Sequence, residues 1–572
     1  MMPHYSIRAA ATLLITLSAA APVVAQEMPA NAAVDTIFAN WDSPTSPGCA
    51  LGVYRDGRII YTRGYGMADL ERRVAITPHT VFDIGSTSKQ FAAASIVLLA
   101  QDGRLSLDDD VRRHVPELPS YERTITIRHL LHHTSGLRDY IGLLTMGGAS
   151  TDDVTTAEDA LDAIARQRQL NFAPGDEHLY SNSGYFLLSI IVERVTGESL
   201  RDFARQRLFE PLGMQRTHYL GSYDDVVPDR ALAYAPRPGG GLRADMSRWL
   251  QLGDGAVFTT VEELLLWDNN FYDAKVGGTA LLDALHERGR LANGDSLSYA
   301  LGLGHARYRG LRTVSHGGSW GGYRAELLRF PEQRFSVATL CNLGTINPTS
   351  LSQRVADVFL ADLLEATAAA TAPNTTASVG AAAAPAPVAV PEATLRALAG
   401  TYRNPATRAM RVITFQDGAL HLTAGGRFEM RPVSASDFTL VNAPAEVAIT
   451  FEPAHADAPA RLRWTQAGQQ TVDFDRLDLV TLTAPQLEEY TGRYHSAELE
   501  TAFTLRVVDD VLTVYRRGDG PQPLRPMTRD EFVSGSVTLR FQRNAAGAID
   551  GYRLDLGRVR DLRFERTGDA QE

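Results

Sequence analysis

A serine and a lysine three residues apart are the first residues in this chain whose types and spacing suggest chemistry. Ser86 and Lys89 lie in the second half of the stretch Phe82–Lys89, and the apolar run that follows, Phe91–Leu99, predicts a helix. At a helix start, residues three apart share one face, and the helix N-terminus favours developing negative charge. Ser86 is therefore a candidate nucleophile, and Lys89 can take its proton where burial or nearby cations lower the lysine pKa.

Lysine is rare in this chain, which gives Lys89 more weight. Of 56 basic residues only two are lysine, Lys89 and Lys275, and the others are arginine. Arginine stays protonated in proteins, whereas a desolvated lysine can lose its proton. A solvated helix lysine is the alternative interpretation of Lys89. Lys275 lies in a polar stretch and is expected in a surface loop.

Tyr180 and Asn182 form a second cluster, in a turn before the apolar helical run Phe186–Val195. A tyrosine two residues from an asparagine can point into the same cleft. Tyrosine can relay a proton, and the asparagine side chain offers a donor and an acceptor to a substrate amide. Such a pair is more often structural, and only the company of Ser86 and Lys89 favours a functional role.

A glycine-rich stretch, Ser315–Tyr323, forms a third cluster at the end of a predicted strand. His316 can bind substrate or shift protons near neutral pH, while Gly318 lets a substrate approach the backbone, whose N–H groups can stabilise an oxyanion. The alternative is a hairpin turn with an incidental histidine. Ser319 completes a G-x-S-x-G pattern, but a strand and no helix follows it, so we reject Ser319 as the nucleophile.

Neither a metal nor an organic cofactor is expected. His132 and His133 lack an acidic or cysteine partner at ligand spacing, and two packed histidines at a helix end are the simpler interpretation. The stretch Gly302–Gly304 lacks the third glycine and the helix of a dinucleotide-binding fingerprint.

Composition and the N-terminus predict an exported soluble protein. The chain has 572 residues, 44% hydrophobic, with a formal net charge of −11 and no basic cluster, so nucleic acid is not an expected partner. Arg8, the apolar run Ala9–Ala21 and the small residues Val23–Ala25 are typical of a signal peptide over residues 1–25. The alternative to a cleaved signal peptide is a retained membrane anchor. If the signal peptide is cleaved, we expect no stable membrane insertion and a periplasmic or secreted protein.

The chain has two cysteines, Cys49 and Cys341, each in an apolar β-like run. Export permits a disulfide. We expect two buried free thiols instead, because a disulfide also needs adjacent strands with suitable geometry.

The chain divides into a mixed region, a linker and a duplicated region. Residues 30–365 have strand-like runs at both ends, including a hairpin signal at Asp56-Gly57, with helices between; an α/β domain is predicted whose first and last strands share one sheet. Residues 366–391 are rich in Ala, Thr and Pro and predict a linker.

The remaining chain contains a repeat. Leu395-x-x-Leu398-x-Gly400-x-Tyr402 recurs as Leu487-x-x-Tyr490-x-Gly492-x-Tyr494. Dense alternating segments predict two small antiparallel β-barrels or sandwiches, over residues 392–481 and 484–567.

Four ordered motifs resemble the penicillin-binding-protein and class C β-lactamase-related serine hydrolases. They are Phe82–Lys89, His133–Leu137, Tyr180–Asn182 and His316–Gly318. The resemblance covers about residues 30–365, and the two repeats look like the barrels that follow the catalytic domain in bacterial D-aminopeptidase.

The resemblance implies an α/β (α+β) catalytic domain with a five-stranded antiparallel sheet flanked by helices. It also implies roles at matching positions: Ser86 as nucleophile, Lys89 as its partner in proton transfer, and Tyr180 as general base or acid. Asn182 would bind the substrate amide, and the main-chain N–H groups of Ser86 and Ser319 would form the oxyanion hole.

One departure from the family pattern bears on substrate. β-Lactamases and DD-peptidases of this family carry Lys-Thr-Gly where this chain has His316-Gly317-Gly318. A histidine with a pKa of about 6.5 is mostly neutral at pH 7 and supplies no permanent charge for a substrate carboxylate. We therefore expect an exported serine hydrolase for a small amide, peptide or ester, with D-amino-acid peptides among the candidates.

Two alternatives remain open at this point. One is a β-lactamase or DD-carboxypeptidase, and the other is a non-catalytic receptor for peptidoglycan fragments. The repeats could shape the cleft, contact cell-wall material or join protomers, and the sequence does not choose among these roles.

Overall fold

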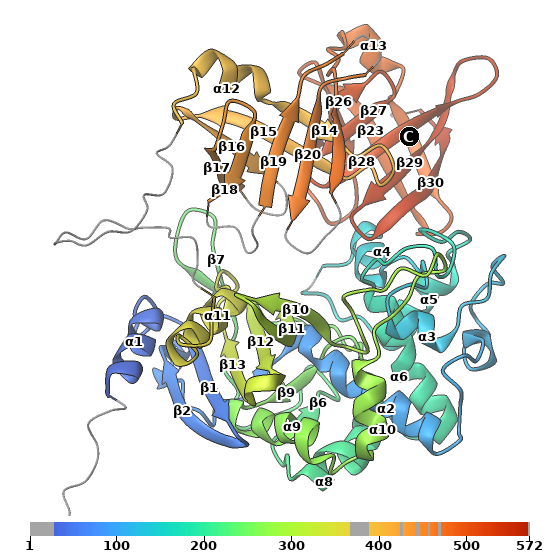
Figure 1. Cartoon of the computed structure of the whole chain (residues 1–572). Coiled ribbons are helices and arrows are strands. Elements are labelled where there is room, and N and C mark those ends of the chain that lie inside the picture. Colours follow the sequence, from blue (N-terminus) through green and yellow to red (C-terminus); the bar gives the residue numbers. More distant parts are fainter. Residues whose placement is uncertain are drawn as a thin grey trace, which may run out of the picture.

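The computed structural model describes residues 28–150, 152–365, 388–423, 427–441, 447–455, 458–466 and 471–569. The predicted signal peptide and residues 366–387 of the predicted linker lie outside them. The described chain forms an α/β unit (28–365), a first β unit (388–476) and a second β unit (484–568), and both β units lie on one side of the α/β unit (Figure 1). Among the described residues, no helix is both long and apolar enough to cross a bilayer.

The α/β unit is built around one antiparallel sheet. In spatial order its strands are β10 (Gly304–Tyr308), β11 (Leu311–Trp320), β12 (Tyr323–Phe330), β13 (Phe335–Cys341), β1 (Cys49–Arg55) and β2 (Arg58–Tyr65). The first and last long strands, β1 and β13, lie in one sheet, as predicted, and they pair directly. The sheet has six strands where five were expected, because β10 pairs with the start of β11 and adds an edge strand. Asp56 and Gly57 both have positive φ and close the β1–β2 hairpin that the Asp-Gly pair predicts.

Helices cover both faces of this sheet. Side chains of β1 alternate between two cores: Cys49, Leu51 and Val53 face one, while Ala50 and Tyr54 face the other. The first core includes α1 and α11, and the second includes the larger helical lobe around α2. The helices are α1 (Met28–Phe38), α2 (Lys89–Gln101), α3 (Ile127–Leu131), α4 (Tyr140–Met146), α5 (Ala157–Ala165), α6 (Asn182–Thr196), α7 (Leu200–Ala204), α8 (Glu210–Leu212), α9 (Val261–Asp273), α10 (Gly278–His286) and α11 (Pro348–Phe359).

Short strands complete the α/β unit. They are β3 (Met67–Asp69), β4 (Val74–Ala75), β5 (Phe82–Asp83), β6 (His218–Tyr219), β7 (Tyr234–Pro236), β8 (Leu242–Ala244) and β9 (Val257–Thr259). Strands β5, β9 and β6 form a small sheet of their own. The α/β (α+β) prediction for this region is confirmed, with one strand more than expected in the main sheet.

Cys49 and Cys341 form a disulfide, so the expectation of free thiols was wrong. The two residues are directly opposite each other in the β1–β13 register, with their Cα atoms 4.0 Å apart. This register follows from the hydrophobic pattern of both strands, which seats both cysteines in the same buried core.

The two β units are barrel-like. After α12 (Glu392–Leu398), the first β unit closes into a barrel because β14 pairs with β21. Its strands are β14 (Gly400–Arg403), β15 (Met410–Gln416), β16 (Ala419–Thr423), β17 (Arg427–Pro432), β18 (Asp437–Leu440), β19 (Val447–Glu452), β20 (Arg461–Gln466) and β21 (Val472–Arg476).

The second β unit follows α13 (Ala484–Glu488) as a nine-stranded sheet that begins at β25 and ends at β26. Its strands are β22 (Gly492–Ser496), β23 (Thr501–Val508), β24 (Val511–Tyr515), β25 (Gln522–Pro523), β26 (Arg525–Thr528), β27 (Glu531–Ser534), β28 (Val537–Arg543), β29 (Ile549–Leu556) and β30 (Val559–Gly568). Since β25 and β26 are consecutive in the chain, the sheet is nearly closed.

Equivalent residues of the sequence repeat occupy equivalent structural positions. Tyr402 and Tyr494 are both buried, and each hydroxyl donates to the carbonyl oxygen four residues earlier, at 2.8 and 2.9 Å. Asp417 and Asp509 both have positive φ in the turn after the second strand of their unit. The two β units therefore share one local plan.

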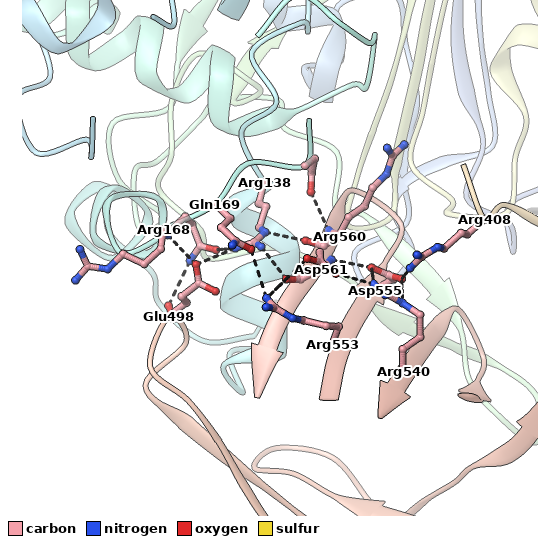
Figure 2. Close-up of polar contacts among 12 residues, drawn as sticks. Arg138, Arg168, Gln169, Arg408, Glu498, Arg540, Arg553, Asp555, Arg560 and Asp561 are labelled. Atoms are coloured by element: carbon pink, nitrogen blue, oxygen red, sulfur yellow. Dashed lines mark hydrogen bonds and ion pairs between the residues drawn. The ribbon is translucent and has the colours of Figure 1, made fainter. Parts of the chain in front are cut away.

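The second β unit docks on the α/β unit. Its apolar core continues into α4 and α5 through Leu143, Met146 and Ala163. Arg138, whose side chain is fully buried, donates to Glu498 Oε1 at 3.0 Å and to the main-chain oxygens of Arg560 and Asp561 at 2.9 and 3.1 Å (Figure 2). Buried charge is tolerated only where such partners surround it, so these contacts fix one docking geometry.

Candidate active site

Ser86 lies at the junction of a short strand and the central helix. Strand β5 pairs with β9, and the N–H of Ile84 donates to the carbonyl of Val257 at 3.0 Å, which fixes the chain just before the serine. A single 3₁₀ turn, Gly85–Ser88, then leads into α2. Gly85 has a φ of +49° and a side chain there would meet the main chain of Ser319 at 2.7 Å, so the position requires glycine.

Lys89 is the first residue of α2 and is fully buried. Its Nζ donates to Ser86 Oγ at 3.1 Å, to Asn182 Oδ1 at 2.9 Å and to the main-chain oxygen of Asp254 at 2.6 Å. Burial lowers the pKa of Lys89 to about 8, although the nearby Asp254 and Asp139 carboxylates oppose the shift. A substantial fraction of this lysine is therefore neutral near pH 8, as a proton acceptor must be.

The Tyr180 ring faces the same lysine. Lys89 Nζ lies 4.8 Å from the ring centroid, and the ring of His133 packs on it at 4.2 Å. Within the described residues, the Tyr180 hydroxyl is buried without a hydrogen bond. Burial raises the pKa of Tyr180 well above its usual value, an effect that nearby Ser86 and Arg558 partly oppose. At neutral pH the residue is a phenol, which can donate a proton but is not a tyrosinate base.

Asn182 begins α6 and connects the lysine to an aspartate. Its side-chain oxygen accepts from Lys89, while its main-chain N–H and Nδ2 both donate to Asp139 Oδ2, at 2.8 and 3.0 Å. Asp139 in turn caps the N-terminus of α4. The predicted amide-binding side chain is thus held in one orientation.

Strand β11 closes the other side of the site. Thr87 Oγ1 donates to the main-chain oxygen of His316 at 3.0 Å, and a side chain at Gly318 would meet the carbonyl oxygen of Ile84 at 1.8 Å. Glycine at 318 therefore allows the strand to lie directly against the nucleophile turn. Ser319 lies near the end of β11, before the hairpin to β12, so no helix follows it.

His316 is neutral and engaged on both ring nitrogens. Burial, reinforced by Lys89, lowers the pKa of His316 to about 4. Its Nδ1 lies 2.7 Å from the carbonyl oxygen of Gly317, which can only accept, so Nδ1 carries the proton. Nε2 then accepts from the Tyr299 hydroxyl at 3.0 Å. His316 supplies no positive charge to the site.

These residues line one cavity of about 1030 Å³. Ser86, Tyr180, Asn182, His316, Gly318 and Ser319 are all on its wall, and Lys89 lies directly behind Ser86. Every residue predicted for the site from the sequence is therefore brought together. Trp249, Trp320 and Phe258 supply apolar wall, which suits a substrate with an apolar side chain.

Three residues that help to build the site were not predicted from the sequence. Asp139 orients Asn182, the main chain of Asp254 holds Lys89, and Arg558 reaches the cavity from the second β unit. Asp139 and Asp254 could have been suspected only from their place in short polar turns. Arg558 lies in a Gly-Arg hairpin turn and carries no local signal. His132 and His133 pack at the end of α3, as expected.

A comparison with known protein families matches residues 34–362 to the family described as Beta-lactamase. This match covers more than half of the chain. The chain belongs to the Beta-lactamase family. Among curated relatives, D-aminopeptidase of Gluconobacter oxydans (strain 621H) is 29% identical over 296 residues, which are 52% of this chain and 56% of that protein. Penicillin-binding protein 4* of Bacillus subtilis (strain 168) is 30% identical over 314 residues, 50% of this chain and 66% of that protein.

Solved structures show the Beta-lactamase fold. The octameric penicillin-binding protein homologue from Pyrococcus abyssi aligns with a TM-score of 0.53 and 21% identity, covering 79% of this chain and all of that one. D-Amino acid amidase from Ochrobactrum anthropi SV3, complexed with L-phenylalanine amide, aligns with a TM-score of 0.50 and 24% identity, covering 58% of this chain and 99% of that one. The match spans little more than half the length of the curated D-aminopeptidase of Gluconobacter oxydans.

Proposed function

We propose that this protein is an exported serine hydrolase that cleaves small amide, peptide or ester substrates through an acyl-enzyme on Ser86, with D-amino-acid amides and peptides as the preferred class. The contact between Lys89 Nζ and Ser86 Oγ, 3.1 Å apart beside a cavity of about 1030 Å³, carries the proposal. It places a buried amine with a pKa of about 8 against a serine at the start of a helix.

In the acylation step, neutral Lys89 takes the Ser86 proton while Oγ attacks the substrate carbonyl carbon. The main-chain N–H groups of Ser86 and Ser319 are the expected donors to the resulting oxyanion. The leaving amine or alcohol must gain a proton, which we expect the Tyr180 phenol to give, with the proton on Lys89 replacing the one lost. Water then attacks the acyl-enzyme, releasing the acid and restoring Ser86.

The substrate class rests on the relatives and on His316. The curated relatives include D-aminopeptidases, and a structural neighbour is a D-amino acid amidase. A neutral histidine with a pKa of about 4 provides no charge where β-lactamases and DD-peptidases carry lysine. Penicillins are accordingly expected to be poorer substrates than D-amino-acid amides, because the position on β11 that this lysine holds carries no charge here.

The test is turnover of D- and L-phenylalanine amide, p-nitrophenyl butyrate and a penicillin by the mature protein and by two serine variants. Ser86→Ala is expected to lose all turnover. Ser247→Ala removes another serine of the same cavity and is expected to keep it. Turnover that survives in Ser86→Ala, or a penicillin as the best substrate, would contradict the proposal.

A further inference from the structure

The cavity beside Ser86 receives a positive charge from the other end of the chain. Arg558 lies in the turn between β29 and β30 of the second β unit, yet it lines the cavity with Ser86 and Asn182. Its guanidinium carbon lies 4.6 Å from the centroid of the Tyr180 ring. The second β unit therefore contributes directly to the wall of the site.

The turn that carries Arg558 is held by its main chain. The carbonyl oxygen of Arg558 accepts from Asn171 Nδ2 at 2.9 Å and from the N–H of Asp139 at 3.3 Å. Asn171 Oδ1 also accepts from the N–H of Arg560 at 2.8 Å. Because these bonds do not involve the Arg558 side chain, the turn can stay in place when that side chain is changed.

The Arg558 guanidinium retains hydrogen-bonding capacity. Its one ion pair in the described structure is with Asp139 Oδ2, at 3.6 Å, which is too long for a good hydrogen bond. Asp139 already accepts two bonds from Asn182 with the same oxygen. The Arg558 side chain is 46% exposed and lines the cavity, so guanidinium donors are available to a ligand there.

The other cationic groups close to the nucleophile are unsuited to bind an anion. Lys89 directs its Nζ at three protein acceptors, and His316 is neutral. The charged groups on the cavity wall are four arginines and two aspartates: Arg230, Arg248, Arg324, Arg558, Asp83 and Asp254. Burial raises the pKa of both aspartates to about 7, so the wall is positive in a chain whose net charge is −11.

From these observations we propose that Arg558 is a substrate-binding residue that selects substrates carrying a carboxylate. A planar guanidinium with free donors matches a carboxylate in a two-point geometry. This inference rests on the proposed function for the identity of the substrate backbone. A carboxylate can lie on the acyl part or on the leaving group, and both sources present the same chemistry to Arg558.

The test measures binding, in the full-length Ser86→Ala background, of two matched ligand pairs by calorimetry. D-Glutamic acid α-amide and D-glutamine amide differ only by a carboxylate in the acyl side chain. D-Alanyl-glycine and D-alanyl-glycine amide differ by a carboxylate on the leaving group. The carboxylate member of at least one pair is expected to bind about tenfold tighter, and the responding pair identifies the side.

Arg558→Gln is expected to bring the ratio of the two dissociation constants in the responding pair close to one, and Arg558→Lys is expected to keep part of the preference. The control Arg563→Gln, which removes an exposed ion pair of β30, is expected to leave the ratio unchanged. Equal weakening of both members of each pair in Arg558→Gln would show a purely structural role and overturn the proposal. So would a carboxylate preference that is absent from the parent or survives in Arg558→Gln. Because binding is read without turnover, failure of hydrolysis in the Ser86 protein would count against the proposed function alone.

Discussion

The two β units have similar local structure but differ in their contacts with the α/β unit. The first β unit closes on itself as a barrel, and none of its described residues forms a hydrogen bond or ion pair with the α/β unit. The second β unit remains open between β25 and β26, joins its apolar core to α4 and α5, and sends Arg558 into the cavity beside Ser86. In the part of the chain that the structure describes, two ion pairs connect it to the first β unit, between Arg403 and Glu531 at 2.5 Å and between Arg408 and Asp555 at 3.9 Å.

This difference indicates how a duplicated module can gain a role in a site. The residues that define the repeat, such as Tyr402 and Tyr494, are buried and support the module itself. The residues that dock the second β unit, such as Glu498 and Arg558, lie in turns, where substitution leaves the module fold intact. Shared cores with divergent turns therefore allow one copy to join the active site.

The largest expected effect comes from the buried docking arginine. Arg138→Ala leaves the buried Glu498 carboxylate without its ion-pair partner, and such losses cost about 3 to 5 kcal/mol. We expect amide exchange in β29 and β30 to accelerate by about a hundredfold or more, measured by hydrogen–deuterium exchange. Arg461→Ala, which removes two surface ion pairs of the first β unit, is the matched control and should change exchange only locally.

Loss of the disulfide should act on the α/β unit alone. Cys49 and Cys341 are separated by 292 residues and join β1 to β13, while neither β unit contains a cysteine. The double variant Cys49→Ala/Cys341→Ala is expected to lose about 2 to 5 kcal/mol of stability in the α/β unit. Denaturant unfolding monitored by exchange should show this loss in β1 and β13 and no change in β14–β21; an equal loss in the barrel would refute the separation of the units.

A smaller effect is expected at a close contact between α4 and the second β unit. A side chain at Gly142 would meet Val559 Cγ2 at 2.8 Å, so Gly142→Ala should weaken docking by about 1 to 3 kcal/mol. Val559→Ala removes the opposing methyl groups, and the double variant should recover part of the loss. If the effects of Gly142→Ala and Val559→Ala on the exchange rates were strictly additive in free energy, the contact between these two residues would not contribute to docking.

The smallest effect concerns pH. Lys89 must be neutral to accept a proton, so kcat/KM should rise with pH through an apparent pKa near 8. Arg558 lowers the pKa of Lys89; its removal favours the protonated lysine and should move the rise to higher pH, by about half a unit. Arg558→Gln should show the shift and Arg461→Gln should not; a shift to lower pH would contradict the electrostatic account.

Local sequence patterns predicted several elements and the candidate catalytic residues, whereas contacts between distant segments could not be predicted from them. Ser86 and Lys89 lie at the start of the helix that the apolar run Phe91–Leu99 predicts, and the Asp56-Gly57 hairpin forms where expected. The Cys49–Cys341 pair depends on which residues face each other across β1 and β13, which neither strand encodes alone. The position of Arg558 on the cavity wall could not be predicted, because the sequence of a hairpin turn does not indicate which surface the turn will contact.

Whether Ser86 forms a covalent intermediate is tested by intact-mass analysis of the mature protein after exposure to a fluorophosphonate. We expect one adduct on the wild-type protein, none on Ser86→Ala, and much slower labelling of Lys89→Arg, because arginine cannot take the serine proton. An unlabelled wild-type protein, or an adduct that persists in Ser86→Ala, would contradict an acyl-enzyme mechanism at Ser86.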